Sequence, residues 1–198
     1  MLLNVAACLL SGECPGLLML FFMTICGSKP LQCSKIFGYY LSIFVRMEVQ
    51  IRPALEHEID TLLEFEQGIV AAERPFDNTL KEGEIHYYDL LELIQSPTAE
   101  VLVAVIGDAL VGSGYAKIVS AKAYQKYELY AHLGFMYVSP EHRGQGINKL
   151  ILEALLRWAR DRNITEVRLE VYDQNESAKK AYSKAGFKPN LLEMRMEL

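Results

Sequence analysis

Beyond residue 47 the spacing of apolar residues changes several times, and each spacing predicts a different element. Apolar positions three or four residues apart are typical of a helix with one buried face. Short alternating or continuously apolar runs are typical of strands. The pattern predicts strands over Val49–Arg52, Glu100–Ile106, Leu110–Val119, Leu129–Val138, Glu166–Tyr172 and Leu191–Leu198, and helices over Leu55–Ala72, Asp89–Gln95, Ile147–Trp158 and Asn175–Ala185.

The connections between these elements predict the fold class. Gly107-Asp108 is a tight-turn signal, so the two strands that flank it should form an antiparallel hairpin. The strand–helix–strand unit over residues 129–172 should be a right-handed crossover between parallel strands. Gly112 and Gly114 inside a strand indicate a bulge or the close approach of another group. We therefore expect an α/β fold with a mixed, mostly antiparallel central sheet and helices on both faces.

Composition divides the chain at Met47. Residues 1–46 hold all four cysteines but only three of the 20 basic and one of the 25 acidic residues. The remainder, residues 47–198, therefore carries a net charge of −7 and no cysteine. An acidic domain lacks the clustered Lys and Arg that phosphate backbones require, which argues against nucleic acid as a partner. We predict an apolar extension over 1–46 and one domain over 47–198.

The extension has three interpretations. Its apolar runs, Gly16–Ile25 and Ile36–Val45, are shorter than the ~20 residues that span a bilayer. It also lacks the early Lys or Arg of a secretion signal. It is either a misassigned start with Met47 as the true initiator, a membrane-associated segment, or an irregular apolar cap on the domain. We favour the first, and with it a cytoplasmic location and no membrane partner. The cysteine spacings match no zinc or haem pattern, so we expect no metal.

One turn carries most of the candidate chemistry. Arg143-Gly144-Gln145-Gly146-Ile147-Asn148 follows an apolar strand and opens an amphipathic helix. Such a turn can hold a phosphate, because glycines expose backbone N–H groups and the helix N-terminus adds partial positive charge. It lacks the Gly-Lys-Ser/Thr of a P-loop and the third glycine of the dinucleotide motif. A plain glycine-containing turn is the structural alternative.

The turn resembles the acetyl-CoA diphosphate loop of the GNAT superfamily of N-acyltransferases. Three further features agree: the helix with Asn175, Tyr182 and Gly186-Phe187, the opening strand Gln50–Ala54, and the order of elements. The resemblance covers about three quarters of the chain and implies the GNAT fold and acetyl-CoA as the co-substrate. Asn148 departs from the family, which carries Gly or Ala at that position.

The resemblance also implies site residues. The strand before the turn would bind the pantetheine arm and the oxyanion through its backbone, and the turn and last helix would hold the rest of CoA. The implied cofactor-binding residues are Met136, Tyr137, Val138, Arg143, Gly144, Gln145, Gly146, Ile147, Asn148, Asn175, Lys179 and Tyr182. Tyr182 would be the general acid for the CoA thiolate, or otherwise a core aromatic residue. Asn175 is also suited to cap the helix.

His132 is the candidate general base. It occupies the strand position at which several GNAT enzymes carry a glutamate, and on a regular strand it would share a face with Gly134, Met136 and Val138. An imidazole can accept a proton from an amine near neutral pH. The alternatives are a hydrogen-bonded core histidine, the weaker candidates Glu170 and Glu128, or a water relay without a dedicated base.

The acceptor site is expected between the first helix and the second strand, at Glu73, Arg74, Phe76 and Tyr87, although a solvated loop or a packed aromatic cluster is the favoured explanation for any one of these residues alone. We predict an N-acetyltransferase that moves the acetyl group of acetyl-CoA directly to a small-molecule or protein amine. A homodimer is compatible with the resemblance. The alternatives are a non-catalytic CoA-binding or regulatory module on the same fold, and a membrane-associated protein that works through its N-terminus.

Overall fold

The structure is a computed structural model, and it describes residues 49–197. The predicted extension over 1–46 and the boundary at Met47 lie outside the described residues, and both stay predictions. Within the described residues no helix combines the length and the apolar character needed to cross a membrane.

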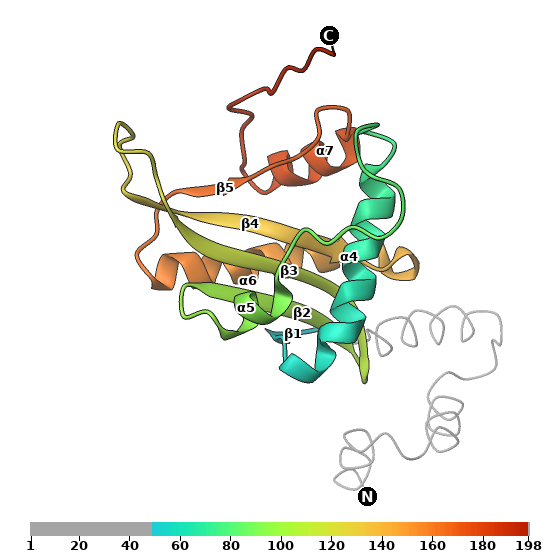
Figure 1. The fold of residues 1–198 in the computed structure, drawn as a ribbon. Coiled ribbons are helices and arrows are strands. Elements are labelled where there is room, and N and C mark those ends of the chain that lie inside the picture. Colours follow the sequence, from blue (N-terminus) through green and yellow to red (C-terminus); the bar gives the residue numbers. More distant parts are fainter. Residues whose placement is uncertain (1–48, 198) are drawn as a thin grey trace, which may run out of the picture. The chain divides into compact units, whose positions relative to one another are not determined.

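A five-stranded sheet with the order β1-β2-β3-β4-β5 forms the centre of the domain (Figure 1). The first four strands pair antiparallel, and β4 and β5 pair in parallel. This confirms the mixed, mostly antiparallel sheet and the parallel crossover. The strands are β1 Gln50–Pro53, β2 Ala99–Ile106, β3 Ala109–Ser120, β4 Leu129–Val138 and β5 Val167–Leu169.

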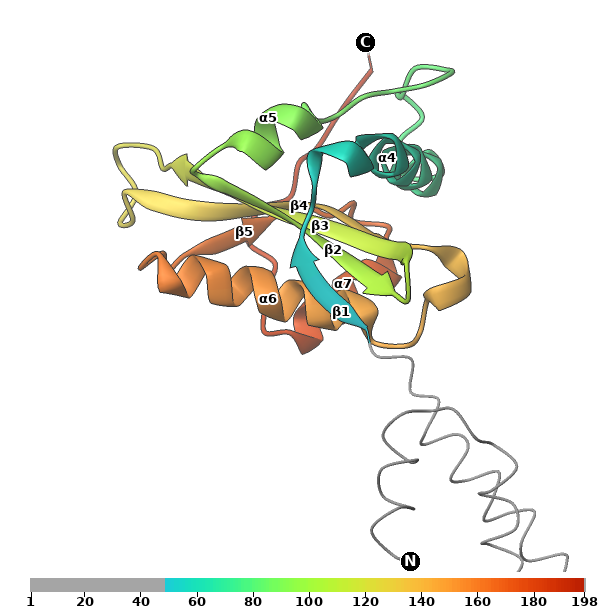
Figure 2. The ribbon, with the colours of Figure 1, turned by 90° about the horizontal axis from the view of Figure 1, so that it is seen from below.

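Helices cover both faces of this sheet, as predicted. Figure 2 shows α4 and α5 on one side and α6 and α7 on the other. The helices are α4 Ile59–Glu73, α5 Leu90–Gln95, α6 Ile147–Asp161 and α7 Glu176–Lys184, with short 3-10 turns at Glu56–Glu58 and Pro140–His142. The predicted first helix begins later, because residues 55–58 form the 3-10 turn and its preceding residue.

The helices on each face of the sheet pack against it and form a separate apolar core. On one face Ile151, Leu155 and Trp158 of α6 pack against Leu133 of β4 and its neighbours. On the other, Leu62, Phe65 and Ile69 of α4 pack against β2 and Phe135 of β4. These helical residues lie at the three- and four-residue spacing seen in the sequence, because that spacing lines one side of a helix.

At Gly114 of β3, side chains of α6 and β4 lie close against the strand. A Cβ atom there would lie 2.7 Å from Met136 Sδ and 2.9 Å from Ile151 Cγ2. The pairing of β3 with β4 also shifts between Ser113 and Tyr115. The glycines of this strand therefore mark both features that were expected, an irregular register and a close contact.

The bulge in β4 changes which side chains share a face. Tyr115 pairs with Gly134 and Ser113 with Tyr137, so two β4 residues lie opposite one β3 residue, and Phe135 has a φ of 56°. Leu133 packs into the α6 core, Phe135 into the α4 core and Met136 again toward α6. The expectation that His132 and Gly134 share a face with Met136 and Val138 is therefore wrong, because the extra residue inverts the alternation.

The predicted final strand is also wrong for the part that the structure describes. Residues 191–197 form no strand, and Leu198 lies outside the described residues. A strand exists only when a neighbour pairs with it, and no described segment pairs with these residues. The predicted strand at 166–172 is shorter for a related reason, since β4 pairs only with Val167–Leu169.

Candidate functional site

The site begins where β4 and β5 part. Their parallel pairing ends at Leu133 and Leu169, whereas β4 continues to Val138. We call the opening between the two strands beyond these residues the split. The amide of Ser139 donates to the carbonyl oxygen of Val111 on the β3 side at 2.9 Å. Because successive amides of a strand point in opposite directions, the amides of Met136 and Val138 face the other side, toward the opening.

Three residues of β4 were predicted to bind through their backbone, and the amides of two of them, Met136 and Val138, therefore face the split. The main-chain groups of Tyr137 point toward β3 instead, because they share the direction of Ser139. The Tyr137 ring packs against Phe65, with centroids 4.8 Å apart, and over Gly68 of α4, where a Cβ would lie 2.5 Å from the ring. Tyr137 thus anchors β4 to α4 rather than facing the opening.

The glycine turn has the backbone geometry of an anion cradle. Gly144 and Gly146 have φ angles of 76° and 83°, in the left-handed region that favours glycine. Gly146 precedes the first residue of α6 and no side chain caps that helix end. Among the residues that the structure describes, none accepts a hydrogen bond from the amides of residues 144–148. These donors and the helix dipole together favour a negatively charged group.

Arg143 and Gln145 frame this turn. Arg143 Nε donates to the carbonyl oxygen of Val138 at 3.1 Å, and Gln145 Nε2 donates to the carbonyl oxygen of Glu141 at 3.3 Å. Within residues 49–197 the two terminal nitrogens of the Arg143 guanidinium make no hydrogen bond. That guanidinium is thus held at the end of β4 with its charge available to an anion.

Three predicted residues lie on helix α7 or at its N-terminal end. Asn175 caps the helix, since its Oδ1 accepts from the Ala178 amide at 3.1 Å. Lys179 is already engaged, with Nζ 3.0 Å from Asp173 and 2.8 Å from Glu176. The Tyr182 ring packs edge-on against Phe187. Burial raises the pKa of Tyr182, and the Glu73 carboxylate raises it further, so the phenol keeps its proton at neutral pH.

The predicted acceptor residues gather around Glu73, the last residue of α4. Burial raises the pKa of Glu73, with a smaller contribution from Asp77. Burial, and then the Glu73 carboxylate, raise the pKa of Tyr87 to about 12. The Tyr87 hydroxyl is buried and has no hydrogen-bond partner among the described residues. The Glu73 carboxylate therefore affects the pKa of Tyr87 through its charge and not through a hydrogen bond. Glu73 thus lies within electrostatic reach of both Tyr87 and Tyr182.

The loop after α4 is fixed from several directions. Asp77 accepts from the Thr79 amide at 2.9 Å and from the Tyr172 hydroxyl at 3.3 Å. Phe76 stacks on Tyr172, with centroids 6.2 Å apart. Arg74 donates to the carbonyl oxygens of Lys81 and Gly83. Phe76 therefore lies beside the Tyr172 that follows β5, whereas the guanidinium of Arg74 is used to shape the loop.

Glu66 is a site-building residue that sequence reasoning missed. This fully buried carboxylate accepts from the amides of Tyr87 and Tyr88 at 2.7 and 3.0 Å and contacts His86 Nδ1 at 2.8 Å. It thereby fixes the Tyr87 segment along α4, seven residues before Glu73 on the same helix face. A glutamate inside the apolar stripe of a predicted helix was the available signal.

His132 lies on the α4 face of β4, half-buried, with its ring 6.2 Å from that of Tyr115. Burial lowers the pKa of His132, and the Glu170 carboxylate partly offsets this. A neutral imidazole at pH 7 follows. The weaker candidate Glu170 thus stands beside His132, whereas Glu128 lies at the far end of β4, beside the β3–β4 turn.

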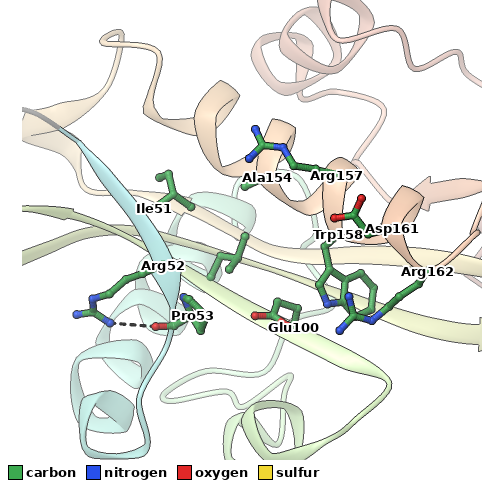
Figure 3. A pocket seen from close by; sticks show the side chains of 10 residues that line it. Ile51, Arg52, Pro53, Glu100, Ala154, Arg157, Trp158, Asp161 and Arg162 are labelled. Carbon is green, nitrogen blue, oxygen red and sulfur yellow. Dashed lines mark hydrogen bonds between the residues drawn. The ribbon is translucent and has the colours of Figure 1, made fainter.

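A separate cavity of about 220 Å³ lies between α6 and the β1–β2 edge (Figure 3). In it the guanidinium of Arg162 lies 4.2 Å over the Trp158 ring. None of the predicted site residues lines this cavity, which therefore does not belong to the site. Within the described part of the chain, no cluster of three or more His, Cys, Asp or Glu side chains could hold a metal ion.

Comparisons with known proteins agree with this geometry. A model of the acetyltransferase (GNAT) family matches residues 67–187, more than half of the chain. A bovine protein, thialysine N-epsilon-acetyltransferase, is 30% identical over 106 residues, which cover 52% of this chain and 58% of that protein. The chain thus spans under two thirds of the length of this relative.

Solved structures show the same fold at low sequence identity. A protein from Bacillus halodurans gives a TM-score of 0.66 at 21% identity, covering 75% of this chain and 99% of its own. A predicted acetyltransferase from Clostridium acetobutylicum, solved with acetyl-CoA, gives 0.58 at 18% identity, covering 75% and 96%. An aminoglycoside 6'-N-acetyltransferase from Acinetobacter haemolyticus gives 0.58 at 18% identity, covering 75% and 99%.

Proposed function

We propose that this chain, which belongs to the acetyltransferase (GNAT) family, transfers the acetyl group of acetyl-CoA to an amine. The observation that carries the proposal is two groups of amides without acceptors among the described residues, one on the split side of β4 and one at residues 144–148 of the glycine turn. These donors match the two parts of CoA that must be held, an extended amide-bearing arm and a diphosphate.

The turn would bind the diphosphate through the amides of residues 144–148 and the free end of the Arg143 guanidinium. The pantetheine arm would lie along β4 in place of the parallel neighbour that β4 lacks beyond Leu133. There Val138 can pair with the arm, and the Met136 amide can donate to the thioester oxygen as negative charge develops on it. Asn175 retains amide donors beside this path, and Lys179 would have to exchange a carboxylate partner to reach it.

Proton transfers complete the reaction. The acceptor ammonium must first lose a proton, which His132 would accept directly or through water. The amine nitrogen then bonds to the acetyl carbon as the carbon–sulfur bond breaks. Tyr182 would give its proton to the departing sulfur, and the second proton of the attacking nitrogen would return to the phenolate as the amide forms. Because burial raises the pKa of Tyr182, this donation requires the phenol to lie against the sulfur. The domain over 47–198 contains no cysteine, which is consistent with direct transfer.

The acceptor we infer is a cationic primary amine. Glu73 offers negative charge beside the rings of Tyr87 and Tyr182, and a carboxylate next to aromatic faces suits an ammonium group. The bovine relative is named for acetylation of an ε-amine, which supports an amine at the end of an aliphatic chain. Small molecules and protein lysines both satisfy this description. The predicted cytoplasmic location and the absence of a nucleic-acid partner stay predictions.

The test combines binding and turnover in the Tyr182→Phe variant. Phenylalanine keeps the ring contact with Phe187 but removes the proton, so kcat should fall about 100-fold while CoA affinity by calorimetry changes little. Tyr124→Phe, in the exposed β3–β4 turn, is the matched control and should leave both unchanged. An unaltered kcat removes Tyr182 from the mechanism. CoA binding without thiol release on a broad amine panel would favour the non-catalytic module.

A further inference from the structure

The bulge in β4 decides which amides of that strand face the split. Before the bulge, the amide of Ala131 donates to the carbonyl oxygen of Glu166, on the β5 side, at 2.9 Å. After the bulge, the amide of Ser139 donates to the carbonyl oxygen of Val111, on the β3 side. Both donors have odd numbers, and on a regular strand amides an even number of residues apart point the same way. The extra residue therefore reverses the alternation, and the Met136 amide faces the split only because of the bulge.

Phe135 is the residue on which this reversal depends. Its φ of 56° lies in the left-handed region, which residues other than glycine rarely adopt. It has no partner in the register between β3 and β4, and its side chain is buried. A large residue keeps such a backbone conformation only where its surroundings hold it there.

Two side-chain hydroxyls contact the main chain of Phe135. The hydroxyl of Ser113, a fully buried residue of β3, donates to the carbonyl oxygen of Phe135 at 3.1 Å. The amide of Phe135 donates to the Tyr88 hydroxyl at 3.4 Å, a long hydrogen bond. The two main-chain polar groups of the bulge residue are thus each contacted by a side chain, one from β3 and one from the segment between α4 and α5.

Tyr88 is itself held in place. Its amide donates to the buried carboxylate of Glu66 at 3.0 Å, and its ring packs edge-on against those of Phe135 and Tyr115, with centroids 5.5 and 5.4 Å apart. The segment between α4 and α5 runs back over the sheet (Figure 1) and also carries Tyr87 of the predicted acceptor site. A single hydroxyl therefore joins the acceptor side of the site to the strand that would bind acetyl-CoA.

We propose that Ser113 and Tyr88 are positioning residues for acetyl transfer, because their hydroxyls hold Phe135 and so keep the Met136 amide directed at the thioester oxygen. Neither hydroxyl touches the substrate in this arrangement. Loss of either one frees the bulge to relax, and the donor then loses its alignment with the oxygen on which negative charge develops. The role in catalysis rests on the proposed function.

The Met136 amide can be observed directly by NMR. The full-length chain is labelled with nitrogen-15 at its seven methionines, and the signal that disappears in Met136→Leu identifies this amide. Acetyl-CoA should move the amide proton of Met136 downfield, and CoA, which lacks the thioester oxygen, should move it less. In Ser113→Ala and Tyr88→Phe the difference between the two ligands should fall by at least half.

Turnover is the second measurement, made with the amine of the panel that gives the fastest thiol release and well below the melting temperature of every variant. In Ser113→Ala kcat should fall about tenfold while KM for acetyl-CoA changes less than twofold, because only the transition state needs the aligned donor. Tyr88→Phe should lose less, since its hydrogen bond is longer. Where Ser113→Ala fails to fold, Tyr88→Phe keeps its ring and decides the test.

Two substitutions are matched controls for these variants. Ser120→Ala removes a hydroxyl from the exposed end of β3. Tyr130→Phe removes one from a half-buried tyrosine of β4 that lies before the bulge. Both variants should keep the kcat of the parent protein and the full difference between the two ligands at the Met136 amide.

Two outcomes overturn the positioning role alone. In the first, both hydroxyl variants keep the full difference between acetyl-CoA and CoA at the Met136 amide. In the second, that difference falls but kcat stays at the value of the parent protein. A parent protein in which neither ligand moves the Met136 signal contradicts the proposed function itself, and the positioning role with it.

Discussion

At the scale of single residues, the environment of His132 makes a prediction about pH. Burial lowers the pKa of His132 below its ordinary value of 6.5. The imidazole of His132 therefore stays neutral, and able to accept a proton, at pH values at which a free histidine is already protonated. If it is the base, kcat/KM should rise with pH through a single step below pH 6.5 and then level off. A pH profile of the parent protein measures this step.

The His132→Ala variant is the control for that profile. It should lower the plateau and remove the step, whereas His142→Ala, at the 3-10 turn after β4, should keep the step in place. The sign also applies to stability. The folded state binds a proton at His132 less readily than the unfolded state does. The free energy of unfolding is therefore higher above pH 6.5 and decreases as the pH falls below that value. A step at or above 6.5 would contradict the assignment to His132.

How far single residues could be predicted depends on whether their placement is local. Tyr182 and Gly146 follow from motifs confined to one helix or turn, so the sequence identified their elements correctly. The face shared by His132 and Met136 could not be inferred, because a bulge at Phe135 arises from pairing with a distant strand. Glu66 was visible only as a polar residue in an apolar stripe, since its partners lie about 20 residues away.

At the scale of elements, the turn before α6 predicts a separable effect of glycine. Gly146→Ala would hold alanine at a φ of 83°, which costs about 1–2 kcal/mol in the left-handed region. Nothing lies within 4 Å of the added Cβ, so the cost is conformational rather than steric. Thermal unfolding should report this loss, and calorimetry should report weaker CoA binding because the amides of the turn reorient.

Gly107→Ala, in the β2–β3 turn, is the matched control. Gly107 also has a positive φ, of 60°, and open space around its Cβ, but it lies outside the candidate site. It should lose a similar amount of stability and keep its CoA affinity. Equal losses of affinity in both variants would show that the turn before α6 has no particular role in binding.

How well a helix or a strand could be predicted depends on where its main-chain hydrogen-bond partners lie. Helices α6 and α7 were predicted well, because a helix satisfies its main chain internally and its apolar stripe is visible in the sequence. Strands need a partner, and the pattern cannot say whether one exists. The segment 191–197 has strand patterning without a described neighbour, and β5 ends where β4 diverges from it.

At the scale of the whole molecule, the two cores predict that residues 47–198 fold without the extension. Both apolar clusters, as far as the structure describes them, draw their members from Val49 to Phe187. A domain of about 150 residues buries roughly 70% of the surface that its unfolded chain exposes, enough for independent stability. A protein started at Met47 should therefore unfold in one cooperative transition and bind CoA as tightly as the full chain. Circular dichroism and calorimetry on both proteins measure this. A piece that stays unfolded would instead favour the interpretation of residues 1–46 as an apolar cap that the domain requires.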